Sequence, residues 1–257
     1  TAPKEKSNVA PDAPVVLKCE NLCRGHAVKN VSFTLRKGEI LGFSGLMGAG
    51  RTETARLVFG ADKMDSGRIF VHGREVKIHS TQDAVNAGIG YLSEDRKRFG
   101  LLVDKSVEEN TVISSLDKFM QGLFIDRKKS KEVSHKYVKE LKTKTPGVSQ
   151  IIKKLSGGNQ QKVVIAKWLV KDSEILIFDE PTRGIDVGAK SEIYALMERL
   201  AKEGKSIIMI SSELPEVLRM SDRVIVMCEG RVTGCLDIEE ANQEQIMQFA
   251  TNRQGGN

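Results

Sequence analysis

Aromatic residues are scarce in this chain of 257 residues, which holds nine Phe, three Tyr and one Trp, or 5% of the total. That scarcity argues against an RNA-binding module, because such modules stack bases on aromatic side chains. It does not indicate disorder, since hydrophobic residues make up 40% of the chain and charged residues 29%, the balance of an ordinary globular protein. A chain of this length can bury a sizeable core and predicts one large α/β domain or two small ones.

Long hydrophobic runs are absent as well. No run approaches the roughly 20 apolar residues that span a bilayer, and no charged-then-apolar signal peptide opens the chain. We therefore expect a cytosolic polypeptide that can still dock on a membrane partner. Residues 1–14 begin with Thr rather than Met and contain Pro3, Pro11 and Pro14, which is a linker composition. We expect a linker at 1–14, a domain at 15–257 and a longer parent polypeptide.

The chain also has few cysteines and only a small excess of charge of one sign. The four cysteines, at positions 19, 23, 228 and 235, have no C-x-x-C spacing and no paired His motif, which favours free thiols in a reducing compartment over disulfides or a zinc site. The net charge of +6 comes from 40 basic and 34 acidic residues. The densest basic runs, 96–98 and 127–129, are short and flanked by acids, which favours solvated helix or loop faces over a DNA-binding patch. We expect no nucleic-acid partner.

What the chain does contain is an alternation of short apolar segments and helical patterns. Several strand segments are nearly continuous in Ile, Val and Leu, which indicates an α/β fold with a mainly parallel sheet covered on both faces. Residues 67–78 have the pattern of a hairpin, and Ser80 and Thr81 begin a short helix. The predicted strands are 15–20, 30–35, 39–44, 67–73, 75–78, 89–93, 174–179, 206–211, 223–228 and 231–236, and the predicted helices are 51–59, 81–87, 187–202 and 213–220.

Between residues 106 and 170 the strand signals fade. Lys- and Glu-rich stretches take over, with apolar residues at helical spacing such as Val133, Tyr137 and Leu141. This pattern predicts an inserted helical segment, which we place at about residues 100–170. Trp168 and Met197 lie at helical core spacing and are assigned to packing.

Residues 45–52, with the sequence GLMGAGRT, follow an apolar strand and precede a helical pattern. This is the context of a phosphate-binding loop, in which glycines let successive N–H groups point at an anion and a helix N-terminus adds its dipole. The Thr52 hydroxyl is placed to hold Mg²⁺. Arg51 stands where the motif has Lys, and its planar fork does not replace a compact ammonium. The alternative is a glycine-rich turn without a ligand.

A second group of motifs lies further along the chain. Residues 155–162, LSGGNQQK, open a helix that runs to about residue 170, so their glycines and Ser hydroxyl form a second anion site at a helix N-terminus. An apolar strand at 175–178 then ends in Asp179 and Glu180. Beside a phosphate loop, Asp179 suits metal-bound water near Mg²⁺, and Glu180 suits polarising a nucleophilic water.

These motifs together resemble the nucleotide-binding domains of ABC transporters over residues 15–237. Residues 45–52 resemble the Walker A motif, 155–162 the signature motif, and 175–182 the Walker B strand, while 183–186 resemble the D-loop. The resemblance implies a P-loop NTPase fold with an antiparallel β subdomain and a helical subdomain, and ATP and Mg²⁺ as cofactors. It implies catalytic positions at Glu180 and Ser212; nucleotide-binding positions at Gly45, Met47, Gly48, Ala49, Gly50, Arg51, Thr52 and Glu94; signature positions at Leu155, Ser156, Gly157, Gly158, Asn159 and Gln160; a D-loop position at Asp186; and metal ligands at Thr52 and Asp179.

Five longer segments narrow the resemblance to the C-terminal half of bacterial monosaccharide-import ATPases of the ribose and galactose type, with the ribose importers most similar. That family implies an N-terminal ATPase half in the same polypeptide, membrane permease subunits, and a periplasmic or extracellular sugar-binding protein as an indirect partner. It also implies a peripheral location on the cytoplasmic face of the membrane. The segments are SGLMGAGRTE, YLSEDRKRFGL, LSGGNQQK, DEPTRGIDVGAK and ISSELPEVL.

Four departures from a competent ATPase site follow from the resemblance. Arg51 replaces the Walker lysine, Glu94 stands at the Q-loop glutamine, and Ser212 stands at the switch histidine. Residues 1–32 contain no aromatic residue to stack on adenine, a contact worth about 1–3 kcal/mol by analogy with base stacking. The resemblance thus implies a degenerate site with slow or no turnover here, while residues 155–160 complete the ATP site of the partner half.

Three alternatives stay open at this point. Residues 94–101 are either a coupling element that senses nucleotide and contacts the membrane subunits, as in the family, or a polar surface loop. The whole chain is either an energising half or a non-catalytic regulatory module, which Arg51 and Ser212 favour and Glu180 disfavours. A soluble ABC ATPase of DNA repair or translation would carry long coiled-coil, zinc or basic insertions, and the sequence has none.

Overall fold

The computed structural model describes residues 2–252. The chain forms two compact units, which we call the sheet unit and the helical unit. Among the described residues, the sheet unit comprises 2–91, 174–180 and 197–252, and the helical unit comprises Leu92–Ser173 and Pro181–Leu196.

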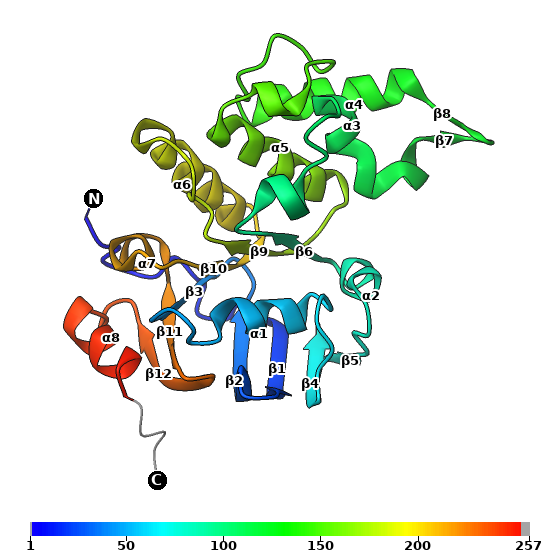
Figure 1. Ribbon diagram of the computed structural model, residues 1–257. Coiled ribbons are helices and arrows are strands. Elements are labelled where there is room, and N and C mark those ends of the chain that lie inside the picture. The colour runs from blue at the N-terminus through cyan, green and yellow to red at the C-terminus, as the bar shows by residue number, and fades with distance from the viewer. Residues whose placement is uncertain (1, 253–257) are drawn as a thin grey trace. The chain divides into compact units, whose positions relative to one another are not determined.

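The larger sheet is built on four parallel strands whose residues are nearly all buried. Every residue of β9 and of β10 is buried, as expected for parallel strands covered on both faces. The strand order is β12-β11-β3-β10-β9-β6, with β12 antiparallel to β11 (Figure 1). These strands are β3 (Ile40–Gly45), β6 (Ile89–Leu92), β9 (Ile175–Asp179), β10 (Ser206–Ile210), β11 (Arg223–Cys228) and β12 (Arg231–Asp237).

A four-stranded antiparallel sheet with the order β2-β1-β4-β5 completes the strands of the sheet unit. Phe33 of β2 meets Phe43 of β3 edge to face, with ring centroids 5.2 Å apart, so apolar side chains join the two sheets. The helix α1 contacts β2 of one sheet and β3 of the other. The elements are β1 (Val15–Arg24), β2 (Val28–Arg36), β4 (Ser66–Val71), β5 (Arg74–Val76) and α1 (Arg51–Val58).

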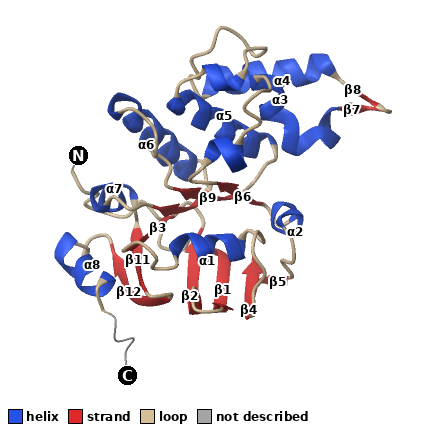
Figure 2. Ribbon diagram, viewed as in Figure 1, coloured by secondary structure: helices blue, strands red, loops and turns tan. Residues whose placement is uncertain are grey.

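Three further helices belong to the sheet unit. The Ser80 hydroxyl and the Asp83 carboxylate form a reciprocal capping box at the start of α2 (Thr81–Asn86), which fixes where that helix begins. The helix α7 (Leu214–Met220) packs on β3, and α8 (Gln243–Ala250) packs on β3, β11 and β12 (Figure 2). These helices cover apolar surface of the parallel sheet.

The helical unit is organised around α5, which contacts α3, α4, η1 and η2. Val112, Phe119 and Val170 form a buried cluster, against which Val133 and Tyr137 pack. A small hairpin of β7 and β8 extends from this unit (Figure 1). The elements are η1 (Arg96–Gly100, a π-helix), α3 (Val107–Val112), η2 (Ile113–Phe119), β7 (Met120–Gln121), β8 (Phe124–Ile125), α4 (Arg127–Glu140), η3 (Ile152–Lys154) and α5 (Gly157–Val170), and α6 (Val187–Lys202) begins here and ends in the sheet unit.

The predicted fold class is confirmed, and each predicted strand and helix has its counterpart in the structure. Trp168 and Met197 are buried as expected. The sequence reasoning missed α8, a helix of eight residues that is too short for a strong periodic pattern. It also missed the β7–β8 hairpin and the π-helix at Arg96–Gly100.

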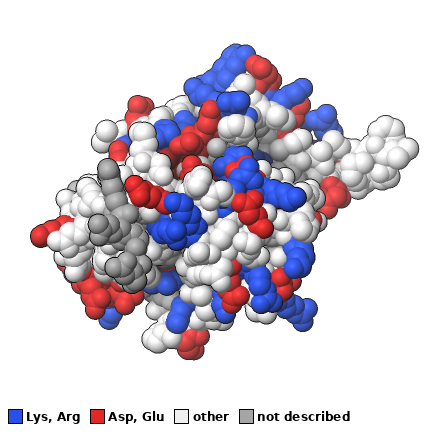
Figure 3. Space-filling model, turned by 60° about the horizontal axis from the view of Figure 1, so that its bottom comes forward, with Lys and Arg blue, Asp and Glu red and all other residues white. Residues whose placement is uncertain are grey.

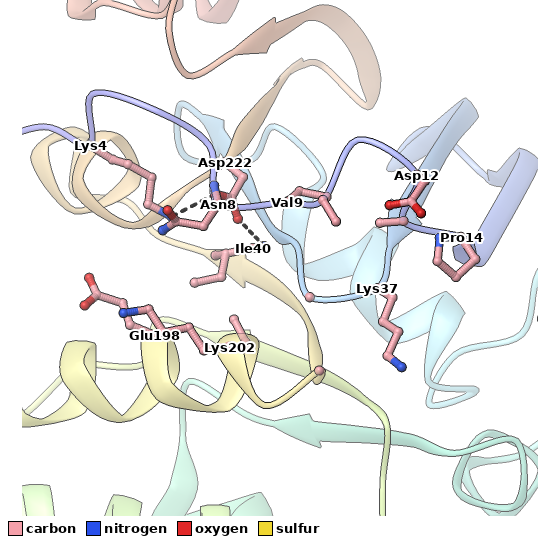
Figure 4. A pocket seen from close by; sticks show the side chains of 15 residues that line it. Lys4, Asn8, Val9, Asp12, Pro14, Lys37, Ile40, Glu198, Lys202 and Asp222 are labelled. Carbon is pink, nitrogen blue, oxygen red and sulfur yellow. Dashed lines mark hydrogen bonds and ion pairs between the residues drawn. The ribbon is translucent and has the colours of Figure 1, made fainter.

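Residues 2–14 have no helix or strand, and part of this segment is held by one buried carboxylate. Asp222 accepts hydrogen bonds from Lys4 Nζ and the Asn8 main-chain N–H, both at 3.0 Å, and from the Ile40 N–H at 2.8 Å (Figure 4). The segment lines a pocket of about 530 Å³ together with Lys37 and the last turn of α6. A linker at 1–14 followed by a domain at 15–257 stays a prediction.

Charged side chains of both signs are interspersed on the face drawn in Figure 3. Several charged side chains of the molecule form ion pairs, for example Arg56 with Asp62 at 2.8 Å. Within residues 2–252 no helix is long and apolar enough to cross a membrane. The four cysteines, all within this described part of the chain, form no disulfide, and burial raises the pKa of Cys19.

Candidate functional site

Two glycines of the loop between β3 and α1 have a positive φ, and one of them also has no room for a side chain. Gly50 has a φ of +102°, and a Cβ there would lie 2.5 Å from the main-chain oxygen of Ala27, whereas Gly48 has a φ of +79° in open space. The loop is held by the Ala49 N–H, which donates to Leu46 O at 3.0 Å, and by the Ala49 carbonyl, which accepts from the Gly230 N–H at 2.9 Å. Residues 45–50 therefore form a fixed turn at the N-terminus of α1, an arrangement able to bind an anion.

Arg51, the first residue of α1, directs its guanidinium at the loop after β10. Its Nη1 donates to the main-chain oxygen of Ser211 at 2.7 Å, a contact that the sequence reasoning did not anticipate. A guanidinium carries five N–H donors, so this bond is compatible with a further contact to an anion at the loop. Arg51 thus connects the glycine loop to the segment that contains Ser212.

Asp179 and Glu180 lie at the end of β9, where the sequence analysis placed two carboxylates. Asp179 is fully buried, and its Oδ2 accepts a hydrogen bond from the Tyr91 hydroxyl at 2.7 Å. Glu180 has a φ of +51°, a left-handed backbone that is uncommon outside glycine and typical of functional sites. Its main-chain N–H donates to Ile210 O at 2.8 Å, which ties the carboxylate pair to β10.

Ser212 forms two hydrogen bonds with the side chain of Glu180. The Ser212 main-chain N–H donates to Glu180 Oε1 at 2.8 Å, and the Ser212 hydroxyl lies 3.3 Å from Oε2. Ser212 therefore holds the Glu180 carboxylate through both its main chain and its side chain. A carboxylate oriented in this way can accept a proton from a water molecule.

The oxygen donors near the glycine loop suit a hard divalent cation. Thr52 is the second residue of α1 and offers a hydroxyl, while Asp179 offers a carboxylate at the end of β9, which β10 separates from β3 in the sheet. Mg²⁺ prefers such oxygen ligands, usually one or two from the protein together with water and substrate phosphates. The residues present fit this ion, although no group of three or more His, Cys, Asp or Glu side chains able to hold a metal occurs among residues 2–252.

The remaining predicted site residues belong to the helical unit. Ser156 caps α5 by accepting from the Asn159 N–H at 3.4 Å, and the Asn159 side-chain Nδ2 donates to the same hydroxyl at 2.7 Å. Gln160 Nε2 donates to Leu155 O at 3.0 Å. Gly157 and Gly158 form the first turn of α5, so the motif combines a capped helix N-terminus with an exposed serine.

Glu94 and Asp186 also lie in the helical unit and not in the unit that carries the glycine loop. Glu94 forms an ion pair with Arg183 at 2.6 Å. The Asp186 carbonyl accepts from the Ala189 N–H at 2.9 Å, at the start of α6. Both predicted residues thus make their contacts within the helical unit.

Arg96 corrects one interpretation of the basic run at 96–98. Solvated faces were expected for this run and for 127–129, and residues 127–129 are indeed exposed. Arg96 is instead buried, and its guanidinium donates to Arg183 O at 2.8 Å. Burial lowers the pKa of Arg96. Within Arg96–Gly100, Arg96 and Gly100 are thus buried, while Lys97, Arg98 and Phe99 are exposed.

The contact of Tyr91 with Asp179 and that of Arg96 with Arg183 are two further contacts that sequence reasoning did not find. Tyr91 is 88 positions from Asp179 along the chain, and Arg96 is 87 positions from Arg183. No local spacing reports contacts of this range. Only a pairing of β6 with β9, which the sequence does not specify, would have suggested the first contact.

A parallel sheet with a glycine loop between β3 and α1, acids at the end of β9 and a helical insert defines a nucleotide-binding cassette. Solved structures share this fold. MJ1267, an ATP-binding cassette of an ABC transporter, matches with a TM-score of 0.79 at 21% identity, over 92% of this chain and 98% of its own. A bacterial Atm1-family ABC exporter with ATP bound matches with a TM-score of 0.70 at 24% identity, over 98% of this chain and 45% of its own.

A sequence profile described as "ABC transporter" matches residues 28–183. The chain belongs to the ABC transporter family.

Curated relatives are more similar in sequence. A putative ribose/galactose/methyl galactoside import ATP-binding protein of Burkholderia lata is 61% identical over 241 residues, which are 93% of this chain and 47% of the relative. A protein of the same description from Geobacillus kaustophilus is 51% identical over 243 residues, 95% of this chain and 48% of the relative. The chain thus spans about half the length of the curated relatives it matches.

Proposed function

We propose that this chain is the ATP-binding, energy-coupling half of a sugar-importing ABC transporter. The observation that carries the proposal is the convergence of Arg51, Glu180 and Ser212 around a glycine loop, in a chain 61% identical to sugar-import ATP-binding proteins. Its cofactors are then ATP and Mg²⁺, and its substrate class is a monosaccharide of the ribose and galactose type. Its location is the cytoplasmic face of the membrane.

The residues of the sheet unit have distinct parts in this proposal. The N–H groups of residues 45–50 and the N-terminus of α1 bind phosphate oxygens. Thr52 and Asp179 hold Mg²⁺, which when bound neutralises phosphate charge. Glu180 orients a water molecule and accepts its proton, and Ser212 keeps the Glu180 carboxylate in place through two hydrogen bonds.

Turnover at this site is proposed to be slow or absent. The Arg51 guanidinium donates one hydrogen bond to Ser211 O, and a forked guanidinium contacts phosphate differently from a compact ammonium. Ser212 is a neutral hydroxyl, so it cannot supply the positive charge of a protonated histidine. Both replacements remove transition-state interactions and leave anion binding largely intact.

The helical unit serves a different site in the same proposal. Residues 155–160 complete the ATP site that is built on the Walker motifs of the partner half, and Asp186 lies at the same interface. The partners are an N-terminal ATPase half in the same polypeptide, membrane permease subunits, and a sugar-binding protein outside the membrane. Glu94 contributes to sensing nucleotide at this chain's own site.

Kinetics on the full-length transporter test the proposal. The catalytic glutamate of the other half is changed to glutamine, so that the remaining ATPase activity reports this site. We expect little activity together with binding of a fluorescent ATP analogue at two sites per polypeptide, one in each half. Brisk turnover under these conditions would refute slow catalysis, and binding at a single site would refute a nucleotide site in this half.

A second candidate is a non-catalytic regulatory module, which the Arg51–Ser211 and Ser212–Glu180 contacts favour because they engage the catalytic positions within the chain itself. Glu180→Gln separates the two candidates when it is added to the full-length transporter whose other catalytic glutamate is already glutamine, because the remaining slow turnover then reports this site. Unchanged residual ATPase activity would support the regulatory module. Reduced activity would support a catalytic role for Glu180.

A further inference from the structure

Three segments of the helical unit converge on the guanidinium of Arg96. Its Nη1 donates to Arg183 O at 2.8 Å, and its Nη2 lies 3.4 Å from Gly184 O. Its Nε lies 3.4 Å from the Gln160 side-chain oxygen. One side chain therefore joins the segment after β6, the first turn of α5, and the loop that leads to Asp186.

Gly157 provides independent evidence that this junction is tightly built. A Cβ at Gly157 would lie 2.5 Å from Arg96 Nη2 and 2.5 Å from Gly184 O. Contacts below 3 Å force a shift, and here one of the two atoms belongs to the main chain. The guanidinium and the Gly184 carbonyl thus pack directly on the main chain of the signature motif.

Two further bonds fasten the same elements together. The Glu94 carboxylate pairs with Arg183 at 2.6 Å, and Gln161 Nε2 donates to Pro181 O at 3.0 Å. At the other end of η1, Lys167 Nζ donates to Gly100 O at 2.9 Å. The segment 94–100 is thereby attached both to α5 and to the loop at 181–184.

The acceptors around Arg96 are three neutral oxygens, namely two main-chain carbonyls and one carboxamide. Neutral acceptors compensate a buried cation less well than a carboxylate does. Burying Arg96 in this way is a poor means of adding stability. The same contacts are well suited to fixing two motifs relative to each other, since a rigid fork has a set geometry.

We propose that Arg96 is a positioning residue that locks the signature motif at 156–160 to the loop at 181–186. Any displacement of segment 94–100 is then transmitted to the motif that serves the partner half. This inference rests on the proposed function, in which that motif completes an ATP site in the other half. It adds a residue that neither the motifs nor the comparisons assign.

The test compares Arg96→Met and Arg96→Lys with the matched control Arg98→Met in the full-length transporter. Arg98 lies two positions away on the same π-helix with an exposed side chain. We measure ATPase kcat and KM, the thermal midpoint, and amide hydrogen exchange of peptides covering 155–162 and 181–187.

For Arg96→Met we expect kcat to fall about tenfold with KM within twofold of wild type, because the Walker motifs of the partner half, which bind the nucleotide at the active site, are unaltered. Exchange in both peptides should rise about tenfold together. Arg96→Lys, which keeps the charge but lacks the fork, should give an intermediate loss, and Arg98→Met should match wild type. If Arg96→Met does not fold, Arg96→Lys carries the comparison.

The proposal is overturned if an Arg96 variant keeps wild-type kcat and wild-type exchange in both peptides. It is also overturned if the fall in kcat is accompanied by a lower thermal midpoint and a higher KM, since that pattern indicates general loss of structure. A wild-type transporter without ATPase activity would refute the proposed function instead. In that case the exchange of the two peptides still decides whether Arg96 joins them.

Discussion

Replacing Gly50 by alanine perturbs the glycine loop at one defined point. The φ of +102° disfavours any side chain, and the added Cβ would lie 2.5 Å from the main-chain oxygen of Ala27. Gly48 offers a matched control, because its φ of +79° is also positive but a Cβ there meets nothing within 4 Å. The two substitutions add the same methyl group and differ in the overlap.

The expected magnitudes follow from this difference. A left-handed backbone costs an L-residue about 1–2 kcal/mol, a cost that both variants share. The overlap at Gly50 forces the main chain to move, which adds about 1–3 kcal/mol. We therefore expect the free energy of unfolding to fall by roughly 1–2 kcal/mol in Gly48→Ala and 2–5 kcal/mol in Gly50→Ala. At about 2–4 °C per kcal/mol for a chain of this size, the second variant should melt at least 2 °C below the first.

Thermal unfolding and titration with a fluorescent ATP analogue measure both consequences. Gly50→Ala should also weaken nucleotide binding more than Gly48→Ala, since moving the main chain misdirects the N–H groups of the loop. Equal melting temperatures for the two variants would refute the reasoning, because the overlap with Ala27 would then cost nothing. Stronger loss of binding in Gly48→Ala would contradict the assignment of Gly50 as the constrained position.

Three further outcomes are expected. Tyr91→Phe removes a hydroxyl that donates to buried Asp179, so chemical denaturation should show a loss of about 1.5–3 kcal/mol, and an unchanged midpoint would contradict this. Burial lowers the pKa of Lys167 to about 8, so the unfolded state binds more protons than the folded state between about pH 8 and 10.5. The free energy of unfolding should therefore rise with pH across that window by up to about 3 kcal/mol relative to Lys167→Met. The same pH dependence of stability in wild type and Lys167→Met would refute this. The double variant Arg51→Lys/Ser212→His should raise turnover at this site at least tenfold, and a further decrease in the ATPase assay would show that these two residues do not limit it.

The sequence predicted those parts of the fold that local patterns determine. β9 and β10 are runs of five buried residues, and short apolar runs bounded by turns can be recognised as strands from the sequence. The glycine loop was predicted because its glycines satisfy local backbone demands, which the φ angles of Gly48 and Gly50 bear out. The helix or strand on which a residue lies could thus be predicted from the sequence, while its contacts with residues distant in the chain could not.

Arg96 illustrates why the rest could not be predicted. In the sequence it is one of three consecutive basic residues, and nothing distinguishes it from Arg98 beside it. The π-helix at Arg96–Gly100 turns Arg96 inward, toward carbonyl groups 87 and 88 positions away, and leaves Arg98 exposed. A run of equal charges therefore contained one structural residue that only the tertiary fold reveals.

The two departures Arg51 and Ser212 are physically connected. Arg51 holds the main chain at Ser211, and the next residue, Ser212, holds Glu180 through its N–H and its hydroxyl. A lysine at position 51 has a single ammonium group and cannot donate to Ser211 O and to a phosphate in the way a forked guanidinium can. We therefore expect Arg51→Lys alone to weaken the contact that holds the segment with Ser212. A histidine at 212 alone must displace a serine whose backbone Arg51 already fixes. Each reversion should therefore be less effective singly than in the double variant, which is why the two changes are tested together.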